Sequence, residues 1–157
     1  MLSIDSWVRI EKIAQEVFKS INPYYFIVGT KKYAQLCSQL SLIFKQSVNL
    51  CGSTSISNLS KLLSTAKVLF AMDSGVSHLA SSFETSIIQF RCSTDDVNPY
   101  SAKSKHRFRP VNDEVRCIEP INLGNPCVGG YCQSHLSHCI NNFSDENLLH
   151  QMIEVAR

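Results

Sequence analysis

The residues best suited to chemistry lie at one turn, Asp73-Ser74-Gly75, with His78 three positions after the glycine. The turn follows an apolar run at 68–72 and opens an amphipathic segment, which predicts a strand, a tight turn and the start of a helix. The first turn of a helix has unpaired backbone N–H groups and the positive end of the helix dipole. Because Ser and Gly are small, an anion can approach these groups closely, so the turn is a candidate phosphate-binding site.

Capping offers a second explanation of the same residues. Asp and Ser are favoured at helix N-caps, and Gly is common in tight turns, without any ligand. His78 would lie on the same helical face as Gly75 and point back toward the turn. It could then donate to a phosphate or sugar oxygen, or it could simply be a packed histidine. Local patterning alone leaves both explanations open.

The elements that must position this turn alternate between strands and helices. Helical spacing of apolar residues predicts helices over 7–21, 31–44, 56–63 and 75–83, and short apolar runs predict strands over 25–28, 47–51, 68–72, 86–90 and 114–118. Short β-α repeats of this kind predict an α/β fold with a parallel sheet and helices on both faces. The continuous apolar run at 25–28 is typical of a strand buried on both faces.

Ligands of such sheets bind beyond the carboxyl ends of the strands. We expect four loops to converge on that rim, which raises the case for a ligand at the turn. The residues that follow the first four predicted strands are Gly29, Gly52, Asp73 and Arg91.

Composition limits the classes of function. The chain has 157 residues, 44% of them hydrophobic and 18% charged, which predicts one globular domain over residues 1–157. A formal net charge of +2 is too small to argue for a nucleic-acid partner. No apolar run approaches the roughly 20 residues that span a bilayer, and the first residues lack the features of a signal peptide. We therefore expect a cytoplasmic protein.

Two irregular segments interrupt the pattern. Residues 92–113 form a locally basic loop, which is either a solvated loop or a contact for an anionic substrate or lipid headgroups. Residues 117–143 form a Cys-rich loop, and residues 144–157 form a C-terminal helix that Ser144 caps. Leu148, Leu149, Met152, Ile153 and Ala156 are expected to face inward from that helix.

Seven cysteines are many for this length. Without an export signal, we interpret all seven as reduced thiols. The Cys-rich loop presents the spacing C-x4-C-x2-H-x2-H-C, which is not a standard zinc-finger pattern. A structural zinc site, a disulfide and packed thiols all remain open there, and elemental analysis would distinguish them. The candidate ligands are Cys127, Cys132, His135, His138 and Cys139.

Several stretches, taken in order, resemble the bacterial heptosyltransferases of glycosyltransferase family 9, and specifically their C-terminal half. The stretch D-S-G-V-S-H-L-A at 73–80 carries most of this resemblance. The others are Trp7 in the first helix, 26–29, 50–56, Pro99-Tyr100 and the Cys-rich tail. The resemblance covers nearly the whole chain.

The resemblance implies one Rossmann-like half of a GT-B enzyme. In that family the C-terminal domain binds the nucleotide sugar, usually ADP-heptose, and the N-terminal domain binds a lipid-linked acceptor and supplies the catalytic Asp. By the same resemblance, Ser74 and Gly75 would donate backbone N–H groups to the diphosphate, and Asp73 would meet the sugar hydroxyls. His78 would sit beside the phosphate and sugar.

Two further pairs of residues are implied at the donor site. Thr54 and Ser55 would lie along the nucleoside, and Ser93 and Thr94 would supply a hydroxyl after the strand at 86–90. This chain departs from the family pattern at Arg91, where the usual residue is Gly. It also has Lys31-Lys32-Tyr33 where many members place a ribose-binding Glu. These departures bear on the identity of the donor.

The resemblance predicts the donor-binding domain of an inverting glycosyltransferase of lipopolysaccharide core synthesis, at the cytoplasmic face of the inner membrane or free in the cytoplasm. We expect the acceptor domain and the catalytic base to be absent from this chain, which would then be inactive alone. No acidic pair stands near Asp73, so we expect transfer without a metal and no cofactor.

Two other classes remain as alternatives. A non-catalytic nucleotide- or sugar-binding module could share the fold, because fold does not determine function. A flavodoxin-like signalling domain would need an acidic pocket at the end of the first strand, and residues 29–32 (Gly-Thr-Lys-Lys) do not supply one.

Overall fold

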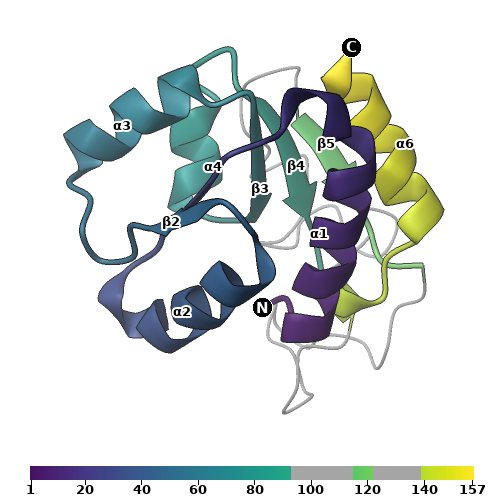
Figure 1. Ribbon diagram of the computed structural model, residues 1–157, viewed down its shortest axis with the longest axis horizontal. Helices are drawn as coiled ribbons and strands as arrows, with labels where there is room; N and C mark the ends of the chain where they lie inside the picture. The colour runs from purple at the N-terminus through teal and green to yellow at the C-terminus, as the bar shows by residue number, and fades with distance from the viewer. Residues whose placement is uncertain (93–114, 122–138) are drawn as a thin grey trace, which may run out of the picture.

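The computed structural model describes residues 1–92, 115–121 and 139–157 (Figure 1). Helices and parallel strands alternate through them as expected. The α-helices are α1 (Ile4–Val17), α2 (Ala34–Ile43), α3 (Ile56–Thr65), α4 (Gly75–Ala80) and α6 (Asp145–Ala156), and the strands are β1 (Tyr25–Ile27), β2 (Ser47–Asn49), β3 (Val68–Met72), β4 (Ser86–Phe90) and β5 (Val115–Ile118). Short 3₁₀ turns occur at Lys19–Ile21, Lys31–Tyr33 and Cys139–Asn141.

All strand pairs in the described residues are parallel, but they form two ladders. β1 pairs with β2, and β4 lies between β3 and β5 in a three-stranded sheet. Val68 is opposite Ser86 and Met72 is opposite Phe90, so β3 and β4 are aligned along their whole length. The expected α/β Rossmann-like architecture is confirmed, with its strands divided between two sheets.

Helices cover both faces of the strands. On one face α1 contacts α2 and α6, and α6 also contacts β4 and β5. On the other face α3 contacts α4, which rests on β3 and β4 (Figure 1). Each face has its own apolar core. Trp7, Ile10, Ile88 and Met152 belong to the larger one, and Leu63 belongs to the smaller one beneath α3 and α4.

Serine side chains begin three of the helices. Ser3, Ser55 and Ser144 each accept a hydrogen bond from the backbone N–H three residues later, at 3.1–3.2 Å. A serine side chain in this position satisfies one of the N–H groups that a helix start leaves without a partner. The expected cap at Ser144 is therefore confirmed.

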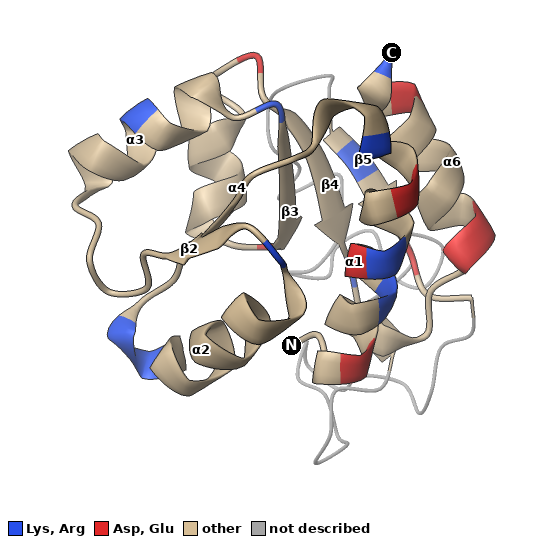
Figure 2. Cartoon of the chain, viewed as in Figure 1, with Lys and Arg blue, Asp and Glu red and all other residues tan. Residues whose placement is uncertain are grey.

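The N-terminal and C-terminal helices are joined through Arg9. Its guanidinium donates to Asp145 Oδ1 and to the backbone carbonyls of Asn141 and Phe143, and it lies 4.2 Å from the centre of the Phe143 ring. Charged side chains gather on α1 and α6, whereas α2 carries none (Figure 2). Arg9 thus joins α1 to α6 by hydrogen bonds, charge and ring contact together.

Burial differs from expectation at three apolar residues. Phe26 is 47% exposed, so β1 is not buried on both faces. Successive strand residues project to opposite faces, and Phe26 lies on the face opposite to Tyr25, whose ring packs against Phe44. Ile21 lies beyond the end of α1 and is exposed, and Ile153 is 40% exposed while Val155 takes the buried position in α6.

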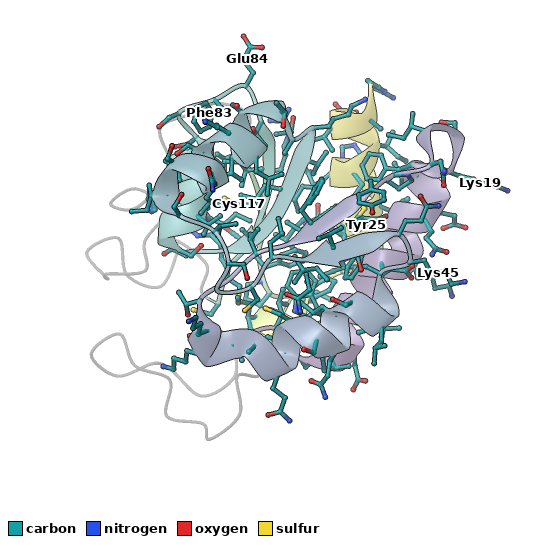
Figure 3. The ribbon with its side chains drawn as sticks, turned by 60° about the vertical axis from the view of Figure 1, so that its left-hand side comes forward. Lys19, Tyr25, Lys45, Phe83, Glu84 and Cys117 are labelled. Atoms are coloured by element: carbon teal, nitrogen blue, oxygen red, sulfur yellow. The ribbon has the colours of Figure 1, made fainter. Side chains whose placement is uncertain are left out.

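Tyr25 anchors β1 to the helical layer of α1 and α2. Its ring lies 4.9 Å from the ring of Phe44, centre to centre, and Phe44 in turn meets Trp7 edge-on at 6.1 Å. Figure 3 shows the Tyr25 ring on the α1 side of its strand. Burial raises the pKa of the Tyr25 phenol, and the neighbouring Glu11 carboxylate raises it further. This aromatic cluster holds β1 against α1 and α2.

Candidate functional site

The turn between β3 and α4 has the form that its residue types predict. Ser74 is extended, with φ −161° and ψ 163°, and precedes the first helical residue, Gly75. A Cβ added to Gly75 would meet no heavy atom within 4 Å, so the space in front of this residue is open. The backbone at the start of α4 is therefore accessible to a ligand.

Asp73 and His78 flank this opening. His78 Nε2 lies 3.6 Å from Asp73 Oδ1, and each side chain is about two-fifths exposed. The imidazole thus points back toward the turn, as its position on the helix predicts. Between them the two side chains offer a hydrogen-bond acceptor and an imidazole at the edge of the same opening.

Ser77 fixes the conformation of the turn from its buried side. Its side chain is fully buried, and its Oγ accepts from the Ser74 N–H at 3.2 Å and donates to the Ser74 carbonyl at 2.7 Å. The Ser74 N–H is therefore already engaged within the protein. In the part of the chain that the structure describes, the N–H groups of Gly75 and Val76 have no acceptor, so they are the donors left for an anion.

Gln89 is a residue of this site that the sequence patterning missed. It lies in β4 with no exposed surface, and its Nε2 donates to Ser77 Oγ at 3.1 Å. The sequence did contain an indication of this role, because Gln89 is an amide side chain between the apolar residues Ile88 and Phe90 of the strand. A buried amide needs a partner, which points to a polar contact on the neighbouring element. Gln89 positions the turn through Ser77.

Arg91 follows β4 at the same end of the sheet. Only 4% of its surface is exposed, and its backbone N–H donates to the Ile118 carbonyl at 2.9 Å. Neither terminal nitrogen of its guanidinium has a hydrogen-bond partner among the described residues. The chain thus places a buried guanidinium beside β5, at the position where the resemblance implies glycine.

The β2–α3 loop carries the two residues assigned to the nucleoside. Ser55 caps α3 by accepting from the Asn58 N–H, and Thr54 precedes it. Gly52 adopts φ +69°, and its N–H donates to the Gly29 carbonyl at 2.7 Å, so the loops after β1 and β2 meet. Within the described residues, no hydrogen bond or ion pair joins this loop to Asp73 or His78.

The remaining candidates fall largely outside the described residues. This holds for Ser93 and Thr94, for the basic loop, and for Cys127, Cys132, His135 and His138. Cys139 is described and buried, in the 3₁₀ turn before α6. Across residues 1–92, 115–121 and 139–157, no three Cys, His, Asp or Glu side chains gather in a way that could hold a metal ion.

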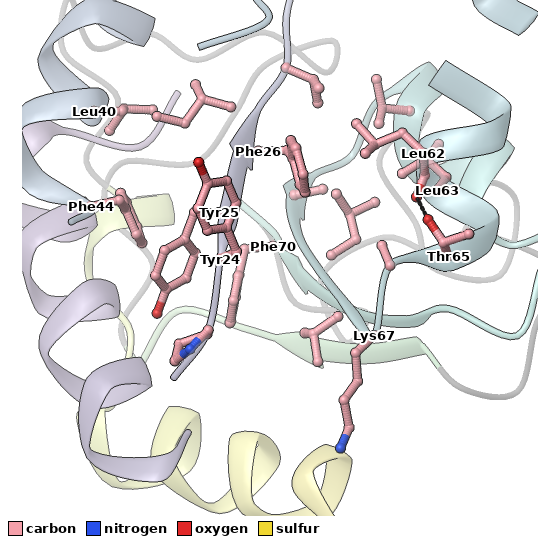
Figure 4. Close-up of a pocket in the computed structure, with 18 of the residues that line it drawn as sticks. Tyr24, Tyr25, Phe26, Leu40, Phe44, Leu62, Leu63, Thr65, Lys67 and Phe70 are labelled. Atoms are coloured by element: carbon pink, nitrogen blue, oxygen red, sulfur yellow. Dashed lines mark hydrogen bonds between the residues drawn. The ribbon is translucent and has the colours of Figure 1, made fainter. Parts of the chain in front are cut away.

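A cavity of about 390 Å³ lies between β1 and β3 and reaches the turn (Figure 4). Its lining is mostly apolar, and Ser74 and Val76 belong to it. Phe26 and Phe70 point into it from the two strands. The cavity is therefore distinct in character from the polar opening between Asp73 and His78.

Comparisons with known proteins agree on one family. The family model of glycosyltransferase family 9 (heptosyltransferase) matches residues 25–136. The structure is similar to that of E. coli ADP-heptose LPS heptosyltransferase II, with a TM-score of 0.64 and 16% sequence identity. That similarity covers 96% of this chain and 41% of the E. coli chain, so this chain spans less than half the length of that relative. The comparison with curated proteins found no match. No helix among the described residues has the length and apolarity to cross a membrane.

Proposed function

The chain belongs to glycosyltransferase family 9, the heptosyltransferase family, and from this premise we propose that it binds the nucleotide-sugar donor of an inverting glycosyltransferase. The proposed donor is ADP-heptose, and the proposed reaction belongs to lipopolysaccharide core synthesis. The observation that carries the proposal is the opening at the start of α4. Two unpaired backbone N–H groups lie there between Asp73 and His78.

The residue types of this opening suit a sugar diphosphate. The N–H groups of Gly75 and Val76 would donate to diphosphate oxygens, and the open space before Gly75 lets the phosphate approach. Asp73 would accept from sugar hydroxyls, and His78 would donate to the phosphate or to a sugar oxygen. Ser77 and Gln89 would keep these groups in place without touching the donor.

The proposed reaction moves a glycosyl group to an acceptor hydroxyl. The acceptor oxygen bonds to the anomeric carbon, the bond from that carbon to the diphosphate oxygen breaks, and its electron pair leaves with the nucleoside diphosphate. The hydroxyl proton passes to a carboxylate base. Negative charge grows on the departing diphosphate, and fixed N–H donors stabilise that charge in the transition state without having to reorganise.

The base and the acceptor site are proposed to lie outside residues 1–157. The E. coli relative is more than twice as long as the part that this chain matches, which leaves room for an acceptor-binding half. We propose a lipid-linked, anionic acceptor, at the cytoplasmic face of the inner membrane. The chain alone would then bind donor weakly and transfer nothing. Turnover of ADP-heptose by the isolated chain would contradict this division of labour.

Titration with ADP, followed by amide NMR, tests donor binding. We expect shifts at Gly75, Val76 and His78, and loss of these shifts in His78→Ala. The matched control is His150→Ala, because His150 is an exposed histidine on α6, on the other face of the sheet. No shift at Gly75 and Val76 with about 1 mM ADP, a concentration that reveals even weak binding, would contradict the proposal.

A second titration with ADP-heptose, UDP-glucose and GDP-mannose compares donors. This chain departs from the family pattern at Lys31 and Arg91. The experiment therefore measures directly which nucleotide base and which sugar the chain prefers. We expect ADP-heptose to bind more tightly than either hexose donor. Tighter binding of a hexose nucleotide would keep the transferase assignment and overturn the assignment of the sugar.

A further inference from the structure

Two cysteine side chains meet where the loops after β1 and β2 approach each other. Cys37 lies near the start of α2, and Cys51 lies in the β2–α3 loop. A Cβ added to Gly29 would lie 3.4 Å from Cys37 Sγ and 3.7 Å from Cys51 Sγ, so both sulfurs pack against the same glycine. The two thiols are therefore neighbours although they come from different elements.

Hydrogen bonds hold Cys51 in this place. Its Sγ donates to the Thr30 carbonyl at 3.2 Å, and its backbone N–H donates to Asn49 Oδ1 at 3.0 Å. The next residue, Gly52, donates its N–H to the Gly29 carbonyl at 2.7 Å. The backbone around Cys51 is thus fixed on both sides. Rotation about the Cα–Cβ bond of Cys51 is therefore the movement that changes the distance between the two sulfurs.

The two thiols differ in their access to solvent. Cys37 is 3% exposed, whereas Cys51 is partly exposed. Burial is the largest of the causes that raise the pKa of the Cys37 thiol to about 12, and a hydrogen bond with Cys51 and the charge of Cys51 are the next. A reagent from solution therefore meets Cys51 first, and Cys37 lies behind it as a shielded thiol.

An accessible thiol next to a shielded one is suited to redox chemistry. A buried cysteine alone is an ordinary small packing residue. A second thiol beside it adds a reaction, because redox-sensitive cysteines are accessible and often stand next to a thiol that can displace the bound oxidant. The cysteines in the described part of the chain are all free thiols, so the structure presents this pair in its reduced form.

We propose that Cys37 and Cys51 form a two-cysteine redox site, which a low-molecular-weight disulfide such as glutathione disulfide oxidises to an intramolecular disulfide. Cys51 is the attacking thiol, and Cys37 is the thiol that resolves the mixed disulfide. The oxidised site joins α2 covalently to the β2–α3 loop. This inference is independent of the proposed function, because it involves neither Asp73 nor His78.

The reaction has two steps. The Cys51 thiolate attacks a sulfur of glutathione disulfide, the S–S bond of that molecule breaks, and one glutathione leaves as a thiolate that takes up the proton lost by Cys51. The Cys37 thiolate then attacks Cys51 Sγ, and the mixed disulfide breaks to release the second glutathione, which takes up the Cys37 proton. Two protein thiols are thus oxidised to one disulfide, and one glutathione disulfide is reduced to two thiols.

The first step assists the second. Once Cys51 carries glutathione, its sulfur can no longer be a thiolate, so the part of the Cys37 pKa shift that comes from the Cys51 charge disappears. The Cys37 thiolate then forms more readily beside the sulfur that it attacks. When Cys51 Sγ turns from the Thr30 carbonyl toward Cys37, the two sulfurs can approach to the bonded distance of about 2.05 Å.

Mass spectrometry of the folded 157-residue chain tests the site. The reduced protein is incubated with glutathione disulfide, quenched with acid and digested. We expect the wild type to give two peptides joined through Cys37 and Cys51, and dithiothreitol to separate them. Cys37→Ala should stop at the first step and retain one glutathione on Cys51. Cys51→Ser should form neither product, because Cys37 is shielded.

The matched control is Cys92→Ser, which removes a partly exposed cysteine outside the pair. This variant should form the Cys37–Cys51 disulfide as the wild type does. A melting experiment adds a second readout. The disulfide restricts the unfolded chain between residues 37 and 51, so the oxidised wild type should melt about 5 °C higher than the reduced protein. The melting temperature of Cys51→Ser should not respond to the oxidant.

Three results would overturn the proposal. The first is the absence of a Cys37–Cys51 cross-link under conditions in which Cys92 acquires glutathione. The second is a wild type that stops at the mixed disulfide on Cys51, which would mean that Cys37 does not resolve it. The third is a cross-linked protein that melts below the reduced one, because the thiols would then meet only when the fold is distorted. All three are measured on the wild type, so they do not depend on the folding of a variant.

Discussion

Gln89 Nε2 lies 3.1 Å from Ser77 Oγ and donates to it, which joins the middle of β4 to the first turn of α4. Ser77 Oγ in turn contacts both the N–H and the carbonyl of Ser74. The position of the turn therefore depends on a strand that is adjacent in space but lies beyond α4 in the sequence. Removing the Ser77 hydroxyl and removing the Gln89 amide should therefore have different effects on the free energy of unfolding.

Ser77→Ala should destabilise the fold more than Gln89→Met. The alanine leaves the Gln89 amide and the Ser74 N–H without their acceptor in a buried place, which should cost about 1–3 kcal/mol. Methionine in place of Gln89 removes both the donor and Oε1, an acceptor with no partner among the described residues, and should cost less than about 1.5 kcal/mol. Urea unfolding measures both values, and the reverse order would contradict the role given to Ser77.

Gly75→Ala and Gly52→Ala should separate ligand binding from stability. At Gly75 a methyl group meets open space within the protein and favours the helix, so unfolding should be unchanged or up to about 1 kcal/mol less favourable. The methyl would nevertheless occupy the proposed approach of the diphosphate, so ADP binding should weaken. Calorimetric titration with ADP and urea unfolding, made on the same samples, give the two readouts.

At Gly52 the expectation is the opposite. Its φ of +69° is unfavourable for a residue with a Cβ, and that Cβ would clash with Cγ of Lys31. The left-handed backbone alone should cost about 1–2 kcal/mol. If Gly75→Ala destabilised the protein as much as Gly52→Ala, the space before α4 would not be open in solution.

Arg9→Ala should cost much more than Asp145→Ala, although the two side chains form an ion pair. The pair is partly exposed, at 36% and 58%, so removing the carboxylate should cost only about 0.2–1 kcal/mol. Removing Arg9 also removes its bonds to two backbone carbonyls and its contact with the Phe143 ring, and should cost about 1–3 kcal/mol. Thermal unfolding at low and high salt compares them, and salt should diminish most of the Asp145 contribution but only the ion-pair part of the Arg9 contribution.

The Cys37 thiol should react more slowly than the Cys92 thiol. Burial raises the pKa of Cys37 to about 12, and its contact with Cys51 contributes to that rise. Cys92 is partly exposed. Since only the thiolate reacts, iodoacetamide at about pH 8.5 should modify Cys92 first, as peptide mass spectrometry can show. Simultaneous modification of both would mean that Cys37 is not shielded.

The same pKa shift predicts a dependence of stability on pH. The ordinary thiol pKa is 9.0, and the folded value is higher, so the folded state binds the proton more tightly. Below pH 9 both states are protonated and the shift has no effect. As pH rises from 9 toward 12, the unfolded thiol ionises first and the free energy of unfolding decreases. Comparison with Cys37→Ala, which should lose this part of the slope, isolates the contribution.

The extents of several elements followed directly from apolar patterning. β3 and β4 begin and end at the residues expected, because a continuous apolar run between polar turns marks a buried parallel strand. The Ser144 cap and the approach of His78 to the Asp73 turn followed from local helix geometry. Such features depend on residues within one or two turns of each other, so the sequence contains all that determines them.

Expectations failed where burial depends on distant neighbours. Phe26 has the same apolar context as the residues of β4, yet it is half exposed, because it projects to the face of β1 opposite to the one that packs against Phe44. From the sequence, Gln89 is interpreted as an ordinary strand residue. Its hydrogen bond to Ser77 is visible only in the structure. Neither relation can be found from spacing, because each joins residues from different elements.

For this protein, the order and type of its elements and the residue types at the β3–α4 turn were determined by sequence alone, since periodicity, capping and turn chemistry act locally. The tertiary structure alone decided which N–H groups of that turn stay available, what holds the turn in place, and that an apolar cavity lies between β1 and β3. These features arise from packing between elements that are far apart in the chain, and residue spacing does not encode such packing.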